Sequence, residues 1–173
     1  MKLLPILSCT SYRMHTPRWA HSPTSGAGAG AHGGRANRVG VSALYLGLET
    51  QTVISEYQQL SSLMPPGTLV SYEVKIGPVL DFTKGYQVGE WDDLWEDFYC
   101  DWRNLWFDKR IEPPSWVLGD MAIAAGAKGI LFSSRLPAGG VNLVVYTDQL
   151  TDADILTPFD PAALLPKNEA SWK

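Results

Sequence analysis

The chain has 173 residues, of which 45% are hydrophobic and 18% charged, which is enough for one domain with a substantial apolar core. Its formal net charge of −4 argues against general nucleic-acid binding, which usually needs a basic surface. Cys9 and Cys100 are too few cysteines for a disulfide framework and indicate a reducing compartment. No apolar run is long enough to span a bilayer. We therefore expect a cytoplasmic protein that binds neither nucleic acid directly nor membranes.

The first residues contain a short apolar segment, Leu3 to Leu7, that precedes Cys9 in the manner of a lipoprotein signal. Pro5 interrupts this segment, which is also shorter than the apolar core of a signal peptide, usually about 7–15 residues. A first strand that runs toward Tyr12 and Arg13 is the better interpretation.

The most informative stretch runs from Ser25 to Tyr57 and combines a glycine-rich loop, a strand and the start of a helix. The loop, Gly28-Ala-Gly-Ala-His-Gly33, leads into Arg35 and Arg38. Glycines allow positive φ and a close approach to a ligand, and an arginine can donate two parallel hydrogen bonds to phosphate oxygens. The alternative interpretation is a flexible surface loop.

The same glycines match the dinucleotide pattern G-x-G-x-x-G without its context. That pattern follows a strand and opens a helix, whereas here Pro17 and Pro23 precede the glycines and a strand follows them. Neither Lys-Ser nor Lys-Thr comes after the glycines, so the phosphate-binding loop of nucleoside triphosphatases is excluded as well.

The nearly continuous apolar run from Val41 to Leu48, which contains Tyr45, predicts a strand buried on both faces. Thr50 has the character of an N-cap, and apolar residues at helical spacing predict a helix that stops at Pro65-Pro66-Gly67. The apolar positions are Val53, Ile54, Tyr57, Leu60 and Met64. Glu56 falls in the second turn, at the edge of the buried face, where it is either a functional carboxylate or an ordinary solvated glutamate.

Clean alternation from Thr68 to Ile76 predicts a half-buried strand. Gly77-Pro78 breaks the strand, and Val79 to Phe82 resumes as a short one.

The next segment, Trp91 to Trp106, is rich in aromatic and acidic residues. Its aromatic residues, spaced as on one face of a helix, are Trp91, Trp95, Phe98, Trp102 and Trp106. Its acidic residues are Asp92, Asp93, Glu96, Asp97 and Asp101. We expect a helix with an aromatic core stripe and a solvated acidic face. The alternatives are a metal cluster and, where the stripe is exposed, a surface for a partner protein.

The remaining segments predict a helix from Trp116 to Ala125 and a hairpin of two strands, Gly129 to Ser134 and Val141 to Thr147. Pro137-Ala-Gly-Gly140 turns the chain between them. The serines that end the first strand, Ser133 and Ser134, either point into a cleft or begin the turn.

The order of strands, helix, strands, helices and strands suits an α+β domain rather than repeated βαβ units. Neither an internal repeat nor a dividing linker is present, so residues 1–173 are predicted to form a single domain. The tail, residues 148–173, contains Pro158, Pro161 and Pro166, which indicates short turns and a peripheral helix.

Several of these motifs, taken in order, resemble the RES-domain family, named for its arginine, glutamate and serine, which supplies toxins of bacterial toxin–antitoxin pairs. The matching segments are Tyr12-Arg13, Gly33-Gly34-Arg35-Ala36-Asn37, Ala43-Leu44-Tyr45-Leu46, Glu56, Gly129-Ile-Leu-Phe-Ser-Ser134 and Gly140-Val-Asn142. The resemblance extends from about Tyr12 to about Thr147. The family commonly has tryptophan or phenylalanine at the position of Ala36 and proline at the position of Ser133, so these two departures concern the pocket wall.

The resemblance implies an ADP-ribosyltransferase-like fold, with a mixed and split β-sheet flanked by helices, and an enzyme that consumes NAD as a substrate. Arg35 would hold the NAD phosphates and Tyr45 would stack on the nicotinamide. Glu56 would face the nicotinamide ribose, and Ser134 would help to position NAD from the opposing strand. The implied catalytic residues are Glu56, Arg35 and Ser134, and the implied NAD-binding residues are Arg35, Tyr45, Arg13, Asn37 and Ser134.

Cleavage of the nicotinamide–ribose bond suits these residue types. The reaction passes through an oxocarbenium-like state, which a carboxylate near the ribose stabilises electrostatically. The cationic nicotinamide is attracted to an aromatic face, and an arginine on the diphosphate fixes orientation. This chemistry requires no metal.

The sequence leaves three functions open. We expect a mono-ADP-ribosyltransferase that modifies a cellular protein. The alternatives are an NAD glycohydrolase or phosphorylase and, further, a non-catalytic nucleotide-binding module. For either enzyme, the resemblance implies a cognate antitoxin. An antitoxin carboxylate would cover a pocket made electropositive by Arg13, Arg35 and Arg38.

Overall fold

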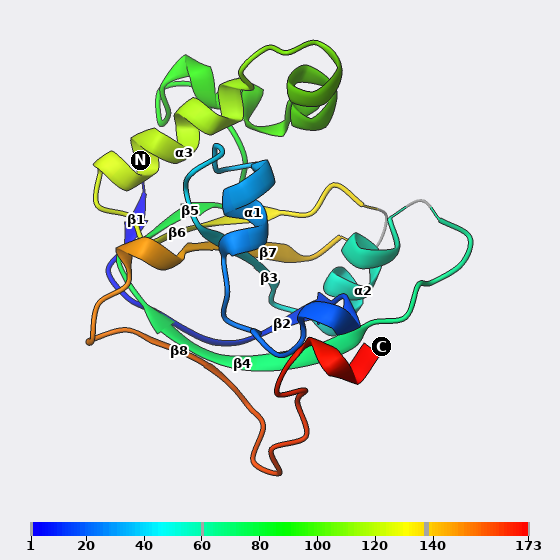
Figure 1. Ribbon diagram of the computed structural model, residues 1–173. Helices are drawn as coiled ribbons and strands as arrows, with labels where there is room; N and C mark the ends of the chain where they lie inside the picture. Colours follow the sequence, from blue (N-terminus) through cyan, green and yellow to red (C-terminus); the bar gives the residue numbers. More distant parts are fainter. Residues whose placement is uncertain (1, 60, 137–138, 173) are drawn as a thin grey trace.

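The computed structural model describes residues 2–59, 61–136 and 139–172, and eight strands occur within these ranges (Figure 1). They are β1 (Leu3–Leu4), β2 (Leu7–His15), β3 (Ala43–Gly47), β4 (Thr68–Ile76), β5 (Val79–Phe82), β6 (Gly129–Ser133), β7 (Val141–Tyr146) and β8 (Ile155–Pro158). They form one sheet in the order β1-β5-β6-β7-β3-β2-β4-β8. Only β5 and β6 pair in parallel among these strands, so the predicted α+β domain with a mixed sheet is confirmed.

Helices of two kinds accompany the sheet. The α-helices are α1 (Ala27–His32), α2 (Thr50–Gln58) and α3 (Pro114–Ala124), and the short 3-10 or π-helical segments are η1 (Pro17–Trp19), η2 (Asp93–Tyr99), η3 (Asn104–Asp108), η4 (Thr147–Gln149) and η5 (Glu169–Trp172). In Figure 1, α3 and the green turns that precede it lie over one side of the sheet, whereas α2 lies near one end of it. No helix in the described part of the chain is long and apolar enough to cross a bilayer.

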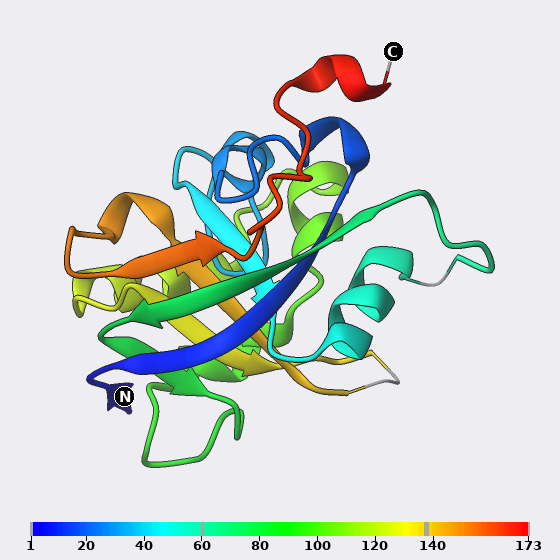
Figure 2. The same cartoon turned by 90° about the horizontal axis from the view of Figure 1, so that it is seen from below.

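The sheet is split between β2 and β3. β2 pairs with β4 along its whole length, but with β3 only where Tyr12 opposes Gly47. In Figure 2 the blue β2 and the green β4 run together across the view, obliquely to the cyan β3 and to the yellow β6 and β7. Val74 and Ile76 of β4 share a core cluster with Leu143 of β7, so the two halves of the sheet pack against each other. The predicted split sheet therefore has a single narrow connection, and the candidate site lies beside it.

The alternation predicted for residues 68–76 is confirmed, because Val70, Tyr72, Val74 and Ile76 are buried while Glu73 and Lys75 are exposed. The strand predicted from Val41 to Leu48 is confirmed as the shorter β3, and the predicted hairpin as β6 and β7. Pro137 and Ala138 of its turn lie outside the described residues. The helix predicted from Trp116 to Ala125 is α3.

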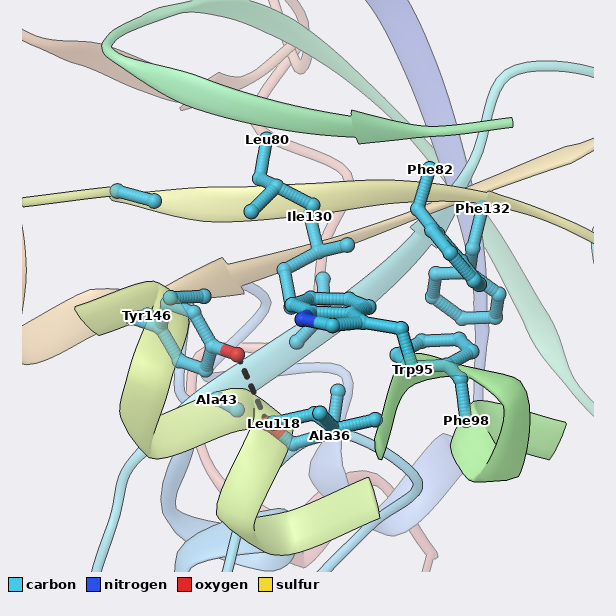
Figure 3. Packing of buried hydrophobic residues seen from close by; sticks show 13 residues of the cluster. Ala36, Ala43, Leu80, Phe82, Trp95, Phe98, Leu118, Ile130, Phe132 and Tyr146 are labelled. Carbon is cyan, nitrogen blue, oxygen red and sulfur yellow. Dashed lines mark hydrogen bonds between the residues drawn. The ribbon is translucent and has the colours of Figure 1, made fainter. Parts of the chain in front are cut away.

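A second core cluster lies between the sheet and the helices (Figure 3). The rings of Trp95 and Phe98 in η2 lie 5.0 and 4.9 Å from the ring of Phe82 in β5, measured between centroids. The ring of Phe98 also lies 5.3 Å from that of Phe132 in β6. Because Trp95 and Phe98 are fully buried, the middle of the aromatic stripe belongs to the core, whereas its ends, Trp91 and Trp106, are half-buried.

The single helix predicted from Trp91 to Trp106 is wrong. The chain forms η2, becomes extended at Cys100 (φ −54°, ψ 157°) and then continues into η3. The carbonyls of Phe98 and Cys100 at this break accept hydrogen bonds from Arg35, an interaction that an unbroken helix would prevent. Trp102 is only 7% exposed, so neither it nor Trp95 offers the docking surface considered from the sequence. The acidic side chains are exposed, as predicted.

The helix predicted from Thr50 to Met64 is too long at its C-terminal end. Its N-cap is Glu49 rather than Thr50, and α2 ends at Gln58 because Gln59 adopts φ 53° and ψ −129°. Met64 is 46% exposed and lies outside the helix, and Leu60 lies outside the described residues.

Two other segments differ from the sequence interpretation. Part of the predicted glycine-rich loop is helical, as α1, and ends at Gly33 with φ 78°. The tail, predicted to contain turns and a peripheral helix, includes the η5 turn but also the edge strand β8, which pairs with β4. The ion pair between Lys128 Nζ and Asp154 Oδ2, 2.6 Å long, holds the chain just before this strand.

Candidate active site

A cavity of about 570 Å³ opens where the sheet splits, within the range common for small-molecule sites. Its walls come from β2, the loop after α1, β3, α2, the segment around η2 and the β6–β7 hairpin. The charged residues in its walls are Arg13, Arg35, Arg103, Arg135 and Glu56. The cavity therefore brings four guanidinium groups and one carboxylate together in a chain whose net charge is −4.

Gly33 and Gly34 let the loop pass under two aromatic side chains. A Cβ on Gly33 would collide with the Trp116 ring, and one on Gly34 would collide with the Tyr45 hydroxyl. Trp116 Nε1 donates a 2.6 Å hydrogen bond to the Gly34 carbonyl, which fixes the loop to α3. The glycine pair thus sets the position of Arg35, the next residue.

Tyr45 and Asn37 hold this loop against β3. The Tyr45 hydroxyl donates to Asn37 Oδ1 at 2.8 Å and accepts from the backbone N–H of Ala36 at 2.9 Å. Asn37 is 1% exposed, and its Nδ2 donates to three backbone carbonyls. Burial raises the pKa of Tyr45 well above its ordinary value, so the phenol stays neutral. The ring of Tyr45 lines the cavity, whereas the amide of Asn37 is used to support the loop.

Glu56 and Ser134, which are far apart in the sequence, meet in this cavity. Ser134 Oγ donates a 2.7 Å hydrogen bond to Glu56 Oε1. Asn142 Nδ2, on β7, donates to the same oxygen at 2.9 Å. No role for Asn142 was predicted from the sequence. The available signal was a polar residue inside the otherwise apolar strand Val-Asn-Leu-Val-Val-Tyr.

Arg13 and Arg35 are anchored by backbone carbonyls. Arg13 Nη1 donates to the carbonyl of Tyr45 at 2.7 Å, across the split in the sheet. Arg35 Nη1 donates to the carbonyls of Phe98 and Cys100 at 3.3 and 3.2 Å. Burial lowers the pKa of both guanidinium groups, but a guanidinium remains charged in proteins. Arg13 Nε is buried and has no hydrogen-bond partner among the described residues.

Two exposed arginines, Arg103 and Arg135, flank the opening and were not predicted. The guanidinium carbon of Arg103 lies 4.7 Å from the Trp102 ring centroid, and that of Arg135 lies 4.8 Å from the Tyr99 ring centroid. Arginine planes stack readily on aromatic faces, which holds these flexible side chains at the cavity. Sequence reasoning missed them because no local motif marks either residue.

Arg38, predicted to lie near the pocket, belongs to a different surface. Its Nη2 forms ion pairs with Glu112 and Asp120, with N–O distances of 2.7 and 2.5 Å. Its charge is therefore balanced by two carboxylates outside the cavity, and the expectation that it contributes to the electropositive pocket is wrong.

A metal cluster was one alternative for the acidic residues between Trp91 and Trp106. No set of three or more His, Cys, Asp or Glu residues suited to a metal ion occurs in residues 2–59, 61–136 and 139–172. The acidic residues of η2 point to solvent instead.

Comparisons with known proteins agree with this architecture. The model of the RES domain matches residues 10–165 of the chain. Among solved structures, the chain is similar to a protein of the M. tuberculosis MbcT–MbcA toxin–antitoxin complex, with 22% sequence identity and a TM-score of 0.59. The similarity covers 90% of this chain and 84% of the other. No curated protein matched the sequence.

Proposed function

The chain belongs to the RES-domain family, and we propose that it is the toxin of a toxin–antitoxin pair and transfers ADP-ribose from NAD to a cellular protein. The observation that carries this proposal is the Glu56 carboxylate, bonded to Ser134 in a cavity whose other charged side chains are arginines. Such a cavity suits a substrate that has a diphosphate at one position and develops positive charge at another.

Glu56 supplies the charge needed at the reacting bond. Loss of nicotinamide leaves an oxocarbenium-like ribose, and a fixed carboxylate stabilises it without having to reorganise. Ser134 and Asn142 both donate to Oε1. This leaves Oε2 to accept a hydrogen bond from a ribose hydroxyl.

Arg13 and Arg35 suit the diphosphate of NAD. Both are anchored through one nitrogen to carbonyl groups, which leaves other N–H groups of each guanidinium for phosphate oxygens. Partial burial strengthens such pairs, because the local dielectric constant is lower than in water. The Tyr45 ring in the same cavity offers a face to the cationic nicotinamide, an interaction worth about 0.5–2 kcal/mol.

A small anionic acceptor is the second candidate, and the arginines at the opening favour it. Arg103 and Arg135 add two charges to those of Arg13 and Arg35. Inorganic phosphate bound there would attack the ribose and make the protein an NAD phosphorylase. Water in the same place would make it an NAD glycohydrolase.

Incubation with NAD labelled in its ADP-ribose part distinguishes these reactions. Label on a protein band after addition of cell lysate identifies transfer to a protein. Free ADP-ribose identifies hydrolysis, and ADP-ribose phosphate that forms only with added phosphate identifies phosphorolysis. NAD that stays intact under all three conditions would overturn the enzymatic proposal and favour a nucleotide-binding module.

The electropositive cavity also suits inhibition by an antitoxin. A carboxylate of the antitoxin would pair with Arg13 or Arg35 as the NAD phosphates do, so antitoxin and NAD would compete. The test uses a candidate antitoxin that co-purifies with this chain. Saturating NAD should weaken the binding of the antitoxin, and Arg35→Ala should weaken the binding of both NAD and the antitoxin. Antitoxin affinity that is independent of NAD would place the contact away from the cavity.

A further inference from the structure

The two hydrogen bonds that the Glu56 carboxylate accepts from Ser134 and Asn142 both go to the same oxygen, Oε1. The hydroxyl of Ser134 and the amide of Asn142 both donate to Oε1, at 2.7 and 2.9 Å. These donors come from different parts of the hairpin, because Ser134 follows β6 and Asn142 lies in β7. Two donors from different directions fix both the position of Oε1 and the plane of the carboxylate.

The position of Asn142 is set by the sheet rather than by a loop. It pairs with Phe132 on β6 and with Gly47 on β3, and it is 8% exposed. Its side chain lines the cavity. A residue held in the interior of a sheet has little freedom to move, which makes it a more precise support for a carboxylate than a loop residue.

Gly47 brings α2 close enough for this contact. A Cβ at Gly47 would stand 2.6 Å from Cγ1 of Val53 in α2, so the helix packs directly against the backbone of β3. Val53 and Glu56 are three residues apart on α2 and lie on the same side of the helix. The close approach at Gly47 therefore places Glu56 within hydrogen-bonding distance of the Asn142 amide on β7, the neighbour of β3.

We propose that Asn142 is a positioning residue for Glu56, and that it holds Oε1 so that Oε2 is presented to the ribose. This role rests on the proposed cleavage of NAD. The amide is suited to it because its Nδ2 is a donor only, whereas a carboxylate in its place would face Glu56 with an acceptor of like charge. A residue that merely filled space would not need this donor.

The test compares Asn142→Asp with Asn142→Ala, using nicotinamide release at several NAD concentrations. Aspartate matches the size of asparagine but removes the donor, and alanine removes both. We expect kcat to fall about 10- to 100-fold in each variant, the equivalent of a hydrogen bond to a charged group, with little change in KM. The aspartate variant should be at least as impaired as the alanine variant. Asn104→Asp, in η3 and outside the lining of the cavity, is the matched control and should retain full kcat.

The opposite order overturns the proposal, because an Asn142→Asp protein that is clearly more active than Asn142→Ala would show that Asn142 only fills space. Equal changes in KM and kcat would also contradict it. Thermal melting of each variant separates these effects from loss of folding.

A crystal structure of Asn142→Asp gives a readout that does not depend on activity. The Glu56 carboxylate should turn away from residue 142, and an unmoved carboxylate would overturn the positioning role. Absence of NAD turnover in the unsubstituted protein would overturn the proposed function alone.

Discussion

At Glu56 a carboxylate is held by neutral donors within a cavity of arginines. Ser134 and Asn142 orient it without cancelling its charge. Arg35 lies in the same cavity, but its Nη1 is directed to the carbonyls of Phe98 and Cys100. The carboxylate charge is therefore available to a developing cation, which is the requirement for cleavage of a nicotinamide–ribose bond.

Glu56→Gln should lower NAD turnover by at least about 100-fold, the size commonly seen when one preorganised electrostatic group is removed. The amide keeps the shape of the side chain but removes its charge, so the melting temperature should change little. Nicotinamide release measures the effect. Glu73→Gln, at an exposed position of β4, is the control, and equal activity of the two variants would remove Glu56 from the catalytic assignment.

Arg35→Ala should raise the NAD concentration needed for half-maximal turnover far more than Arg38→Ala. Arg35 lines the cavity, whereas Arg38 is paired with Glu112 and Asp120 elsewhere. The loss of one charge-assisted contact to phosphate corresponds to about a 10- to 100-fold change. Titration calorimetry with NAD measures it directly. Similar effects of both substitutions would mean that the loop attracts phosphate only diffusely.

At the scale of single residues, the sequence was informative where a motif combined several constraints. Glu56, Arg35 and Ser134 could be placed in one cavity because the segments around them resemble one family. Arg38 could not be separated from Arg35 in this way, because its partners Glu112 and Asp120 are far away in the chain. Asn142 needed the register between β7 and β3 before its contact with Glu56 became visible.

Among the elements, the turn after α1 depends on its glycines for the position of Arg35. Gly34 lies against the Tyr45 hydroxyl and the Asn37 side chain, so any side chain at this position must displace the loop that carries Arg35. A Cβ on Gly30, within α1, would lie 3.4 Å from Cα of Ser42, which is an ordinary contact distance. The two glycines therefore form a matched pair.

Gly34→Ala should destabilise the protein and weaken NAD binding together, because its Cβ overlaps groups that cannot move independently. We expect a loss of about 1–3 kcal/mol, as for other overpacked positions. Gly30→Ala should be neutral or stabilising by up to about 1 kcal/mol, because alanine is the better helix former. Urea unfolding and NAD titration check both variants. Equal stability of the two would mean that the loop has more freedom than the contacts of Gly34 indicate.

At the scale of elements, strands were predicted better than helices. Alternation marked β4 because one face of it is buried, and such a pattern is local. The segment from Trp91 to Trp106 has helical spacing, yet Arg35 binds the carbonyls at its break, an interaction that local spacing does not encode. β8 was missed because its strand character depends on pairing with β4, which lies about 80 residues earlier.

At the scale of the whole molecule, the acidic residues of η2 and the arginines of the cavity lie in different places. The exposed acidic residues of η2 contribute to the net charge of −4, while arginines gather around the cavity. Anions are therefore attracted to one place on an otherwise acidic protein. Composition alone could exclude general nucleic-acid binding, but the gathering of Arg103 and Arg135 with Arg13 and Arg35 required the tertiary fold.

The fold keeps one histidine of β2 neutral although an arginine lies near it. His15 is 7% exposed, and its Nε2 lies 2.6 Å from the Tyr72 hydroxyl. That hydroxyl donates to the carbonyl of Pro23 at 2.8 Å, so Nε2 carries the hydrogen of the pair. Burial, and secondarily the charge of Arg13, lowers the pKa of His15 to about 4.

The protein should therefore lose stability as the pH falls from about 6.5, the ordinary histidine pKa, to about 4. Over this window the unfolded chain binds a proton at residue 15 that the folded chain does not bind, so acid favours unfolding. The difference between the two pKa values corresponds to roughly 3–4 kcal/mol. His15→Gln removes the titrating group, and urea unfolding at several pH values should show a smaller loss of stability than in the unsubstituted protein. His32→Gln, at an exposed position, should leave the loss unchanged, and an identical pH profile for His15→Gln would show that His15 is not kept neutral by the fold.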